Sequence, residues 1–494
     1  MESPLRAERS SSEFGRLAPR IVQVVWAWMV RGEAPETPVA PWTTPAEYYA
    51  SMPLDLPAEG ASEEALVQTV QGILSNSINP WTHRFLEKLY AAPAVVSVLG
   101  DLLLGALNAS VHVFSASPLL TRIEERCVQG LCELFGYGAE ADGVGMPGGA
   151  ASNVLAVQTA LSQALGGVYR GGGVWALVER LHAQGRRGAG ARPAILTSAS
   201  SHFSVARAAL AAGLGADAVV QVPVDAHGRM DVAALEGLLR EMHADAAHPR
   251  GMPLIVCATS GTTVLGAFDD LARIAPLCAQ YGCWLHADAS WGGSAIFAPE
   301  GRALMRGIER ADSVTVNPHK LLAVTHQCSF LLVRDRRTLS VRVDDAGYLF
   351  HEVPGAPDLA TKTLGCGRRG EALKLYLVWL RYGTHGLCAH VQAGLAKART
   401  LLAHLEARAR ALELGPLAEP LFLQICFRPR GQGSEGTRRA HAQLAAAQRY
   451  AVDFAPLPDG EYLRLVVHPS TPLETYRAII DTVSGIQQGT SESL

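Results

Sequence analysis

The sequence predicts an α/β fold in which helices cover both faces of a mostly parallel β-sheet. Two observations carry this prediction. From about Ala94 onward, short runs rich in β-branched residues alternate with alanine- and leucine-rich helical stretches, an order typical of strands joined by helices. From about Cys366 onward, a long helical stretch precedes two further strand candidates. We therefore expect a large sheet domain and a smaller C-terminal α+β domain.

The expected elements follow in chain order. The strand runs of the large domain are "ARPAILTS", "ADAVVQVPV", "MPLIVCATS", "GCWLHADAS" and "DSVTVNP", with helical stretches such as "MDVAALEGLLREMHADA" and "DDLARIAPLCAQY" between them. The small domain contains the helix "RRGEALKLYLVWLRYG" and the strands "LFLQICFRP" and "EYLRLVVHP". We predict three parts, an N-terminal arm of residues 1–93, a large domain of residues 94–365 and a small domain of residues 366–494.

The N-terminal arm consists of helical patches broken by proline-rich joints such as "APETPVAPWTTP", so we expect it to pack on another part of the assembly. Its most apolar run, "IVQVVWAWMV" from Ile21 to Val30, is too short to span a bilayer and is interpreted as a packing helix. The first twenty residues contain Arg and Ser but also Glu2, Glu8 and Glu13, which leaves a targeting segment open.

The composition excludes several classes of partner. The 43 basic and 46 acidic residues give a formal net charge of −3 and form no long blocks, so neither nucleic acid nor an anionic membrane is an expected partner. The nine cysteines show no CxxC pair and no metal-ligand spacing. This pattern predicts a reducing compartment, with the cytoplasm as the default, and no metal site.

Chemically capable side chains follow the predicted strands. His202 follows the first strand, "GTT" from Gly261 to Thr263 follows the third, Asp288 ends the fourth, and His319 and Lys320 follow the fifth. Each alone has a structural explanation, such as a helix cap, a core histidine or a lysine that reaches solvent. Because a parallel sheet directs the ends of its strands to one crevice, we expect these groups to share one site.

A glycine-rich segment, "MPGGAASNVLAVQTAL", precedes these strands and leads into a helix expected to begin near Ala151 or Ser152. Backbone N–H groups at such a start, with the Ser152 hydroxyl, suit a phosphate, although an ordinary loop capped by Ser152 is the alternative. A phosphate cradle, a carboxylate, a histidine and a desolvated lysine together suit pyridoxal 5'-phosphate. Asp288 would keep the pyridine nitrogen protonated, and Lys320 would bind the aldehyde as an imine.

The sequence resembles the group II pyridoxal-phosphate-dependent decarboxylases, in particular the glutamate and cysteine sulfinate decarboxylase branch. The resemblance covers about Asn76 to His468. It rests on "PGGAASN", "TSASSHFSVARAA", "ATSGTTVLGAFD", "WLHADASWGG", "NPHKLL" and "CGRRGEALKLYLVW", which occur in the family's order.

The resemblance implies a fold type I, aspartate aminotransferase-like transferase with a seven-stranded, mostly parallel sheet, and a homodimer in which the N-terminal arm packs. It implies that Lys320 binds the cofactor covalently, His202 stacks on its ring and Asp288 holds its ring nitrogen. It also implies cofactor contacts from a second set of residues and a grip on the substrate α-carboxylate by Arg464. The second set is Ala151, Ser152, Thr262, Asn317 and His319. The implied reaction converts an L-amino acid to the amine and CO2.

Some positions depart from the family pattern. The loop "HEVPGAPDLATKTLG", His351 to Gly365, lacks the tyrosine that protonates the substrate carbon in the family, so we considered His351 and Tyr348 as donors. Ser290 replaces a small apolar residue beside the ring. The substrate-recognition segments also differ, leaving Lys88 and His112 as cations for a distal acid group, each equally explained as structural.

We predict decarboxylation of an acidic amino acid, such as cysteine sulfinate, aspartate or glutamate. Two alternatives stay open at this point. The first is oxidative deamination to an aldehyde, which the loop without tyrosine would favour. The second is a catalytically impaired paralogue with a structural or regulatory role.

Overall fold

The fold is described from a computed structural model, which describes residues 10–40, 44–51, 54–339, 347–350, 355, 357–446 and 449–486. The described residues form two compact units. The larger unit comprises Pro93–Thr400 and Pro416–Cys426. The smaller unit draws its described residues from Met1–Ala92, Leu401–Gly415 and Phe427–Leu494. Each unit is considered separately below.

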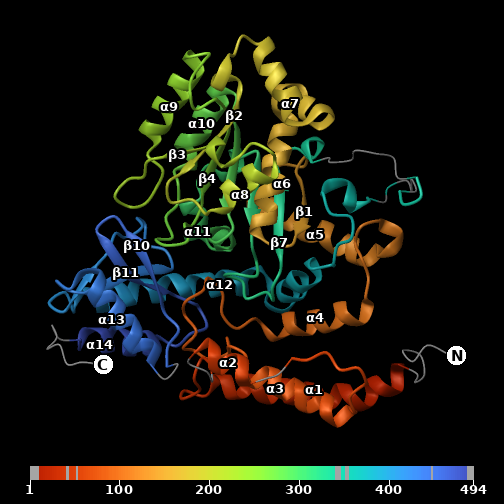
Figure 1. The fold of residues 1–494 in the computed structure, drawn as a ribbon, viewed down its shortest axis with the longest axis vertical. Helices are drawn as coiled ribbons and strands as arrows, with labels where there is room; N and C mark the ends of the chain where they lie inside the picture. The colour runs from red at the N-terminus through yellow and green to blue at the C-terminus, as the bar shows by residue number, and fades with distance from the viewer. Residues whose placement is uncertain are drawn as a thin grey trace. The chain divides into compact units, whose positions relative to one another are not determined.

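A seven-stranded sheet forms the centre of the larger unit (Figure 1). Its strand order is β1-β7-β6-β5-β4-β2-β3, and every pairing is parallel except those that β7 makes with β1 and β6. The bounds are β1 Asp142–Met146, β2 Pro193–Ser198, β3 Val219–Val222, β4 Met252–Thr259, β5 Trp284–Ala289, β6 Ser313–Val316 and β7 Ser329–Val333. The predicted seven-stranded, mostly parallel sheet is therefore confirmed.

Five of these strands, β2 to β6, coincide with the predicted strand runs, because their residues are apolar or β-branched almost throughout. The strands β1 and β7 were not predicted. β1 has the sequence "DGVGM", whose glycines are typical of a loop. A Cβ at Gly143 would lie 2.7 Å from the carbonyl oxygen of Leu331 in β7, so the close approach of the two strands requires glycine there.

Helix α6 (Gly149–Gln163) is the helix that carries the predicted phosphate segment, and it begins two residues before Ala151. Gly148, at φ 109°, precedes it in a conformation that favours glycine. The helix packs against α8 (Ser204–Ala211) and against the strands β4, β6 and β7. Its side chains Val157, Ala160 and Leu161 join β2 and β4 in a buried apolar cluster. This burial fixes the start of α6 at the carboxyl ends of the strands.

The other helices of the larger unit surround the sheet (Figure 1). They are α4 Val95–Leu107, α5 Pro118–Leu134, α7 Val168–Ala183, α9 Val232–Ala244, α10 Leu271–Tyr281 and α11 Pro299–Leu304. The predicted long helix is α12 (Ala372–Glu406), which continues into the smaller unit and breaks its helical geometry at Gly383, where φ is 66°.

The smaller unit contains a four-stranded sheet of order β10-β11-β9-β8, apart from Gln424–Cys426 of β9, which are counted with the larger unit. The two predicted strands correspond to β9 (Gln424–Pro429) and β11 (Gly460–Val466), while β8 (Leu412–Leu414) and β10 (Asp453–Leu457) were not predicted. Its helices are α1 Ser10–Glu33, α2 Pro45–Ser51, α3 Glu63–Ser75, α13 Gly433–Ala445 and α14 Leu473–Ser484.

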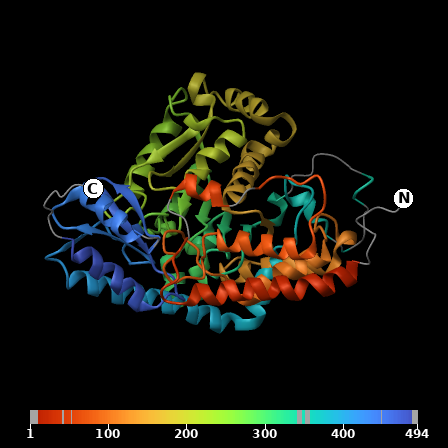
Figure 2. The ribbon, with the colours of Figure 1, turned by 60° about the horizontal axis from the view of Figure 1, so that its bottom comes forward.

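Helices α1 and α3 lie side by side in both ribbon views (Figures 1 and 2). Ion pairs join them, one of 2.9 Å between Arg16 and Glu63 and another between Arg20 and Glu64. The run from Ile21 to Val30 therefore lies inside a packing helix, as predicted. Among the described helices, none combines the length and apolar character that crossing a bilayer requires.

Candidate active site

A cavity of about 300 Å³ lies where the carboxyl ends of the central strands meet the start of α6. It is lined by the residues that follow β2, β4, β5 and β6. Five predicted site residues are among its lining residues, namely His202, Asp288, Asn317, His319 and Lys320. The expectation that a parallel sheet would gather these groups in one crevice is met in the larger unit.

The carboxylate of Asp288 is buried and hydrogen-bonded. The Asn153 side chain donates to Oδ2 at 2.8 Å, and the backbone N–H of Ser290 donates to Oδ1 at 3.1 Å. Burial alone would raise the pKa of Asp288, but the bonds from Ser290 and Asn153 and the nearby His286 and Lys320 outweigh it, so the pKa is lowered. The Asp288 carboxylate is therefore negatively charged and held in one orientation, and such a group can pair with a protonated heteroaromatic nitrogen.

Asn153, a residue that we did not predict, is the hub of this network. Besides Asp288, its Nδ2 group donates to Ser204 Oγ at 2.9 Å, and its Oδ1 atom lies 3.2 Å from His286 Nε2. Because an amide oxygen only accepts, His286 must carry its proton on Nε2. Its Nδ1 atom, 2.8 Å from Ser313 Oγ, then accepts from that hydroxyl. Burial lowers the pKa of His286 to about 4, so the ring stays neutral.

His202 lies at the other end of the same network. Its Nδ1 atom accepts from the backbone N–H of Ser204 at 3.2 Å and lies 2.8 Å from the Ser204 hydroxyl. Burial, followed by the charges of Lys320 and Arg207 and opposed by Asp288, lowers the pKa of His202. A neutral ring with its proton on Nε2 follows. Ser204 holds the ring at Nδ1, and the ring of Phe203 lies 4.2 Å from it, measured between ring centres.

Lys320 shares the cavity with these groups and forms no ion pair among the described residues. Burial lowers its pKa, and the attraction of Asp288 only partly opposes that effect. Its backbone N–H donates to the Asn317 carbonyl at 3.1 Å, which fixes the turn that follows β6. The lysine is thus a desolvated amine, the form in which lysine acts as a nucleophile.

The start of α6 forms a cradle with Asn317. A Cβ at Gly149 would lie 2.6 Å from Ser290 Oγ and 2.7 Å from Asn317 Nδ2, so only glycine leaves this space open. The first backbone N–H groups of a helix have no acceptor within it, and they favour an anion. Thr259 Oγ1, in the same cavity, is buried and has no hydrogen-bond partner among the described residues. These features fit a bound phosphate-bearing ligand.

Three predicted cofactor residues do not line this cavity. Ala151 lines a neighbouring cavity of about 500 Å³. Thr262 is buried, and its hydroxyl accepts from the backbone of Ala267 at 3.0 Å. The hydroxyl of Ser152 lies 2.8 Å from Ser329 Oγ, which itself donates to Asn317 Oδ1 at 2.6 Å. Ser152 therefore orients Asn317 from behind and leaves the Asn317 Nδ2 group facing Gly149.

The loop after Lys320 supplies two lining residues that we did not predict, His326 and Gln327. The His326 ring lies 4.5 Å from that of His319, measured between ring centres. Backbone groups of Cys328 hold His319 at Nδ1, and burial lowers the pKa of His319 to about 3. His319 is therefore a neutral structural support for the loop.

Arg464 lies in β11 of the smaller unit and is described within that unit. Its guanidinium donates to the Glu87 carbonyl at 2.6 Å and to Asp453 Oδ2 at 3.2 Å. Lys88, in the same unit, pairs with Glu87 at 3.3 Å. His112 belongs to the larger unit but does not line the cavity.

The loop predicted to lack the proton-donating tyrosine is described only in part. His351 lies outside the described residues, as do residues 352–354 and 356. Tyr348 is described and is largely exposed.

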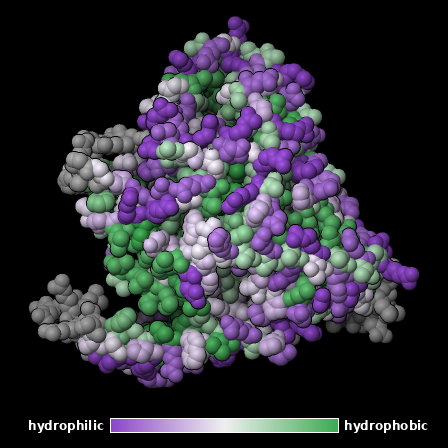
Figure 3. All heavy atoms as spheres, turned by 180° about the vertical axis from the view of Figure 1, so that it is seen from behind, coloured by the Kyte–Doolittle hydropathy of each residue, from purple (hydrophilic) through white to green (hydrophobic). Residues whose placement is uncertain are grey.

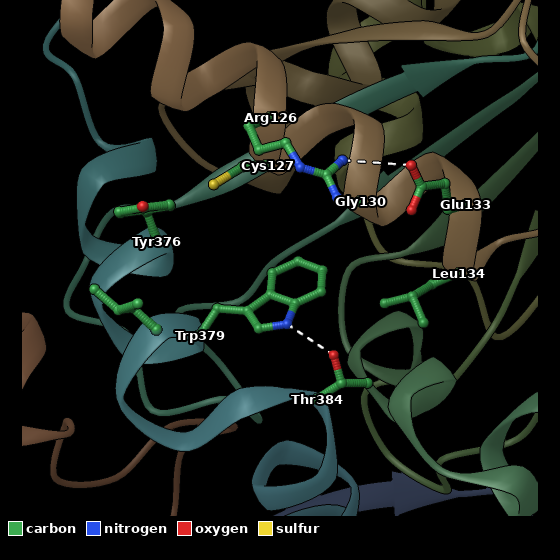
Figure 4. Close-up of a pocket in the computed structure, with 9 residues that line it drawn as sticks. Arg126, Cys127, Gly130, Glu133, Leu134, Tyr376, Trp379 and Thr384 are labelled. Carbon is green, nitrogen blue, oxygen red and sulfur yellow. Dashed lines mark hydrogen bonds and ion pairs between the residues drawn. The ribbon is translucent and has the colours of Figure 1, made fainter.

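A second cavity, of about 400 Å³, lies between α5 and α12 (Figure 4). Trp379 points into it and donates to Thr384 Oγ1 at 3.0 Å, while Arg126 and Glu133 pair along the α5 wall at 3.3 Å. It shares no described lining residue with the first cavity and holds no lysine or histidine. The first cavity is therefore the candidate active site, on the chemistry of its lining.

Comparison with known proteins agrees with this choice. The family model described as "Pyridoxal-dependent decarboxylase conserved domain" matches residues 45–430. The chain is 36% identical to the L-aspartate decarboxylase dtxS4 of Metarhizium robertsii, over 87% of this chain and 83% of that protein. It is 35% identical to the cysteine sulfinic acid decarboxylase of Mus musculus, over 81% of this chain and 78% of that protein. The crystal structure of mouse CSAD superimposes with a TM-score of 0.86 at 29% identity and covers 96% of this chain and 98% of that chain.

Proposed function

Because the chain belongs to the pyridoxal-dependent decarboxylase family, we propose that it removes the α-carboxylate of an acidic amino acid as CO2. The enzyme is an amino-acid decarboxylase that uses pyridoxal 5'-phosphate, and its fold is fold type I. The observation that carries the proposal is the single cavity that holds Lys320, Asp288 and His202. Aspartate, cysteine sulfinate or glutamate is the proposed substrate, because similar proteins are named for aspartate, cysteine sulfinate and acidic amino acids.

The residues present fit the cofactor. Lys320 would bind its aldehyde carbon through Nζ, and the anionic Asp288 would face its ring nitrogen. His202 would lie against its ring. The N–H groups at the start of α6, with Asn317 Nδ2, would hold its phosphate. When bound, the cofactor supplies an electron-withdrawing ring that stabilises the charge left on the substrate α-carbon.

The roles of Ala151, Ser152, Thr262 and His319 toward the cofactor are also proposals. Ala151 is the better phosphate candidate of the pair that the sequence indicated, because both Ser152 groups are engaged: its backbone N–H donates to Gly148 and its hydroxyl contacts Ser329. For Thr262 and His319 we propose support of the cavity wall.

The chain's own side chains would act as follows. Burial lowers the pKa of Lys320 and so favours the uncharged amine, the form whose Nζ would hold the cofactor aldehyde. Asp288 would hold a proton on the ring nitrogen, and the network through Asn153 would keep its carboxylate in place. Arg464 is proposed to bind the substrate α-carboxylate, as the sequence resemblance implies. His351 and Tyr348 stay the proposed proton donors to the α-carbon.

We also propose a homodimer. Helix α4 exposes an apolar stripe at helical spacing, formed by Val95, Leu99, Leu102, Leu103 and Leu107, each about half exposed. On the face seen in Figure 3, apolar residues gather toward the lower left. In such a dimer the N-terminal arm, residues 1–93, would pack on the partner subunit. The division of the chain into this arm, a large domain and a small domain is part of the same proposal.

A cytoplasmic location is proposed on the state of the cysteines. All nine lie within the described residues as free thiols, and seven of them are buried. Such a set is expected in a reducing compartment.

The test is incubation of the cofactor-loaded enzyme with a panel of amino acids, with CO2, amine and peroxide measured together. Equal amounts of CO2 and amine from an acidic amino acid, without peroxide, are expected. Aldehyde, ammonia and peroxide would show that oxidative deamination prevails, which the loop without tyrosine would favour. No turnover of any amino acid would contradict the proposal and indicate an impaired paralogue.

A further inference from the structure

Two turns that contribute lining residues to the candidate cavity are in contact. The β4 turn, residues 261–267, follows β4 and carries Thr263, and the β5 turn, residues 290–292, follows β5 and carries Trp291. The backbone N–H of Gly292 donates to the Ser260 carbonyl at 3.0 Å. A Cβ at Gly261 would lie 2.7 Å from Gly292 N, so this close approach requires glycine at residue 261. A displacement of one turn is therefore expected to displace the other.

The side chain of Gln424 bridges the two turns. It lies at the start of β9, within the larger unit, and is 1% exposed. Its Oε1 atom accepts from Trp291 Nε1 at 3.1 Å. Its Nε2 group donates to the carbonyls of Thr262 at 3.1 Å and Thr263 at 3.4 Å. One buried amide is thus hydrogen-bonded to both turns.

The chemistry of these partners fixes the orientation of the amide. An indole nitrogen only donates a hydrogen bond, and a carbonyl oxygen only accepts one. A reversed Gln424 amide would set its N–H groups against the Trp291 N–H and its oxygen against two carbonyls. A buried polar group that loses its partner bears the full cost of its lost hydration. The three bonds therefore favour one arrangement of the two turns.

Close packing also restricts the Gln424 amide and the indole. A Cβ at Gly266, a residue of the β4 turn, would collide with Gln424 Oε1, and Gly266 has a φ of 70°. The buried ring of Phe422 lies edge-on to Trp291, with 5.8 Å between the ring centres. Edge-to-face aromatic pairs at such a spacing are favourable. Gln424 therefore holds the indole at its N–H group, and Phe422 packs on its ring.

We propose that Gln424 is a positioning residue for the decarboxylation, which holds Thr263 and Trp291 in place in the cavity wall. This inference rests on the proposed function. Gln424 itself is not among the described lining residues, so it would act through these two residues and not by contact with the reacting groups. A displacement of about 1 Å in an active site can cost about a hundredfold in rate. Side chains behind the wall are what prevent such a displacement.

The two turns also flank the carboxylate of Asp288. Thr259, the last residue of β4, pairs with Asp288 in the register of β4 and β5. Ser290, the first residue of the β5 turn, donates its backbone N–H to Asp288 Oδ1 at 3.1 Å. Because Trp291 follows Ser290 directly, a shift of the indole is expected to weaken this hydrogen bond. Loss of the bridge should therefore reduce cofactor affinity as well as the rate of turnover.

The experiment compares the wild type with Q424M, W291F, the double variant and the control Q163M. Q424M keeps the length of the side chain and removes all three bonds, while W291F removes only the bond from the indole. Q163M makes the same change at a glutamine that donates to the Thr338 carbonyl at 3.5 Å, and neither of these residues is among the described lining residues. The readouts are Tm, the cofactor dissociation constant, the circular dichroism of the bound cofactor, and kcat and KM for aspartate and glutamate at saturating cofactor.

Q424M is expected to raise the cofactor dissociation constant and to lower kcat, each by about tenfold or more, and to alter the circular dichroism of the bound cofactor. W291F should show a smaller change in the same direction, because it breaks one bond of the three. The double variant should lose clearly less than the sum of the single losses, since both changes remove the same bond. Q163M should keep the wild-type dissociation constant, circular dichroism and kcat, whatever its Tm.

The outcomes separate this role from a contribution to stability alone. A Q424M protein with a lower Tm but wild-type dissociation constant, circular dichroism and kcat would refute the positioning role, while the proposed function would stand. If Q424M does not fold, W291F decides, and wild-type values in all three readouts would then refute the role. If the wild type turns over no acidic amino acid, the proposed function itself fails, and the cofactor dissociation constants still test Gln424.

Discussion

Replacing Asn153 with leucine tests the network that holds Asp288. Leucine has a similar volume but no polar atoms, so the three hydrogen bonds of Asn153 to Asp288, Ser204 and His286 are lost. The buried carboxylate loses one donor, and the His286 Nε2–H group loses its acceptor. An unsatisfied buried group costs about 1–3 kcal/mol, and a charged one costs more. The expected loss in the free energy of unfolding is about 3–6 kcal/mol, a large share of the roughly 5–15 kcal/mol of a typical domain.

The assay is urea unfolding of the cofactor-free protein, followed by a titration with pyridoxal phosphate. S204A serves as the graded comparison, because it removes one of the three bonds of Asn153 together with the contact between the Ser204 hydroxyl and His202, and it leaves the bonds to Asp288 and His286; it should cost about 1–2 kcal/mol. The cofactor dissociation constant should rise in N153L, since Asp288 loses a bond that keeps its pKa low.

A double-mutant cycle with D288N separates an effect on Asp288 from general damage. If Asn153 acts through Asp288, the two substitutions together should cost clearly less than the sum of their separate effects. An N153L protein that unfolds within about 1 kcal/mol of the wild type and binds the cofactor equally well would refute the role of this network.

Three further perturbations have defined outcomes. His286 has a pKa of about 4 in the fold but about 6.5 when unfolded, so the unfolded chain binds more protons between these pH values. The free energy of unfolding should therefore fall by up to about 1.4 kcal/mol per pH unit as the pH drops through that window. Urea unfolding at several pH values should show that H286Q lacks this part of the pH dependence. K374M removes the buried partner of Glu371, which keeps its ion pair with Arg369, and the hydrogen bond from Lys374 to the His326 carbonyl; it should cost about 1–3 kcal/mol in the free energy of unfolding, whereas an unchanged Tm would contradict a role of Lys374 in holding the loop after Lys320. G149A places a Cβ 2.7 Å from Asn317 Nδ2 and should weaken cofactor binding at least about tenfold in equilibrium dialysis, while unaltered binding would show that the cradle lies elsewhere.

Much of the fold could be predicted because its strands are buried on both faces and therefore consist of continuous apolar runs. The strands β1 and β7 could not, because β1 takes its strand conformation only from pairing with β7, nearly 190 residues away in the chain. The glycines of β1 are required by that pairing and indicate a loop when considered alone.

Some residues of the candidate site could likewise be predicted from the sequence, and others could not. The positions of Asp288 and Lys320 follow from their places at strand ends, so the sequence could predict them. Asn153 becomes meaningful only when α6 packs beside β5, which places it 2.8 Å from a residue 135 positions later. Its residue type gives no signal, because α6 also contains the amides Gln158 and Gln163. His326 offers no signal, because its position depends on the path of the loop after Lys320, including Ala323 at φ 54°.

The most direct test of the account is to reduce the cofactor-loaded enzyme with borohydride and map the modified peptide by mass spectrometry. The account predicts one modified residue, Lys320, in the peptide that contains "NPHKLL", and no modified peptide from K320A. Modification of a different lysine, or of K320A to the same extent as the wild type, would contradict it.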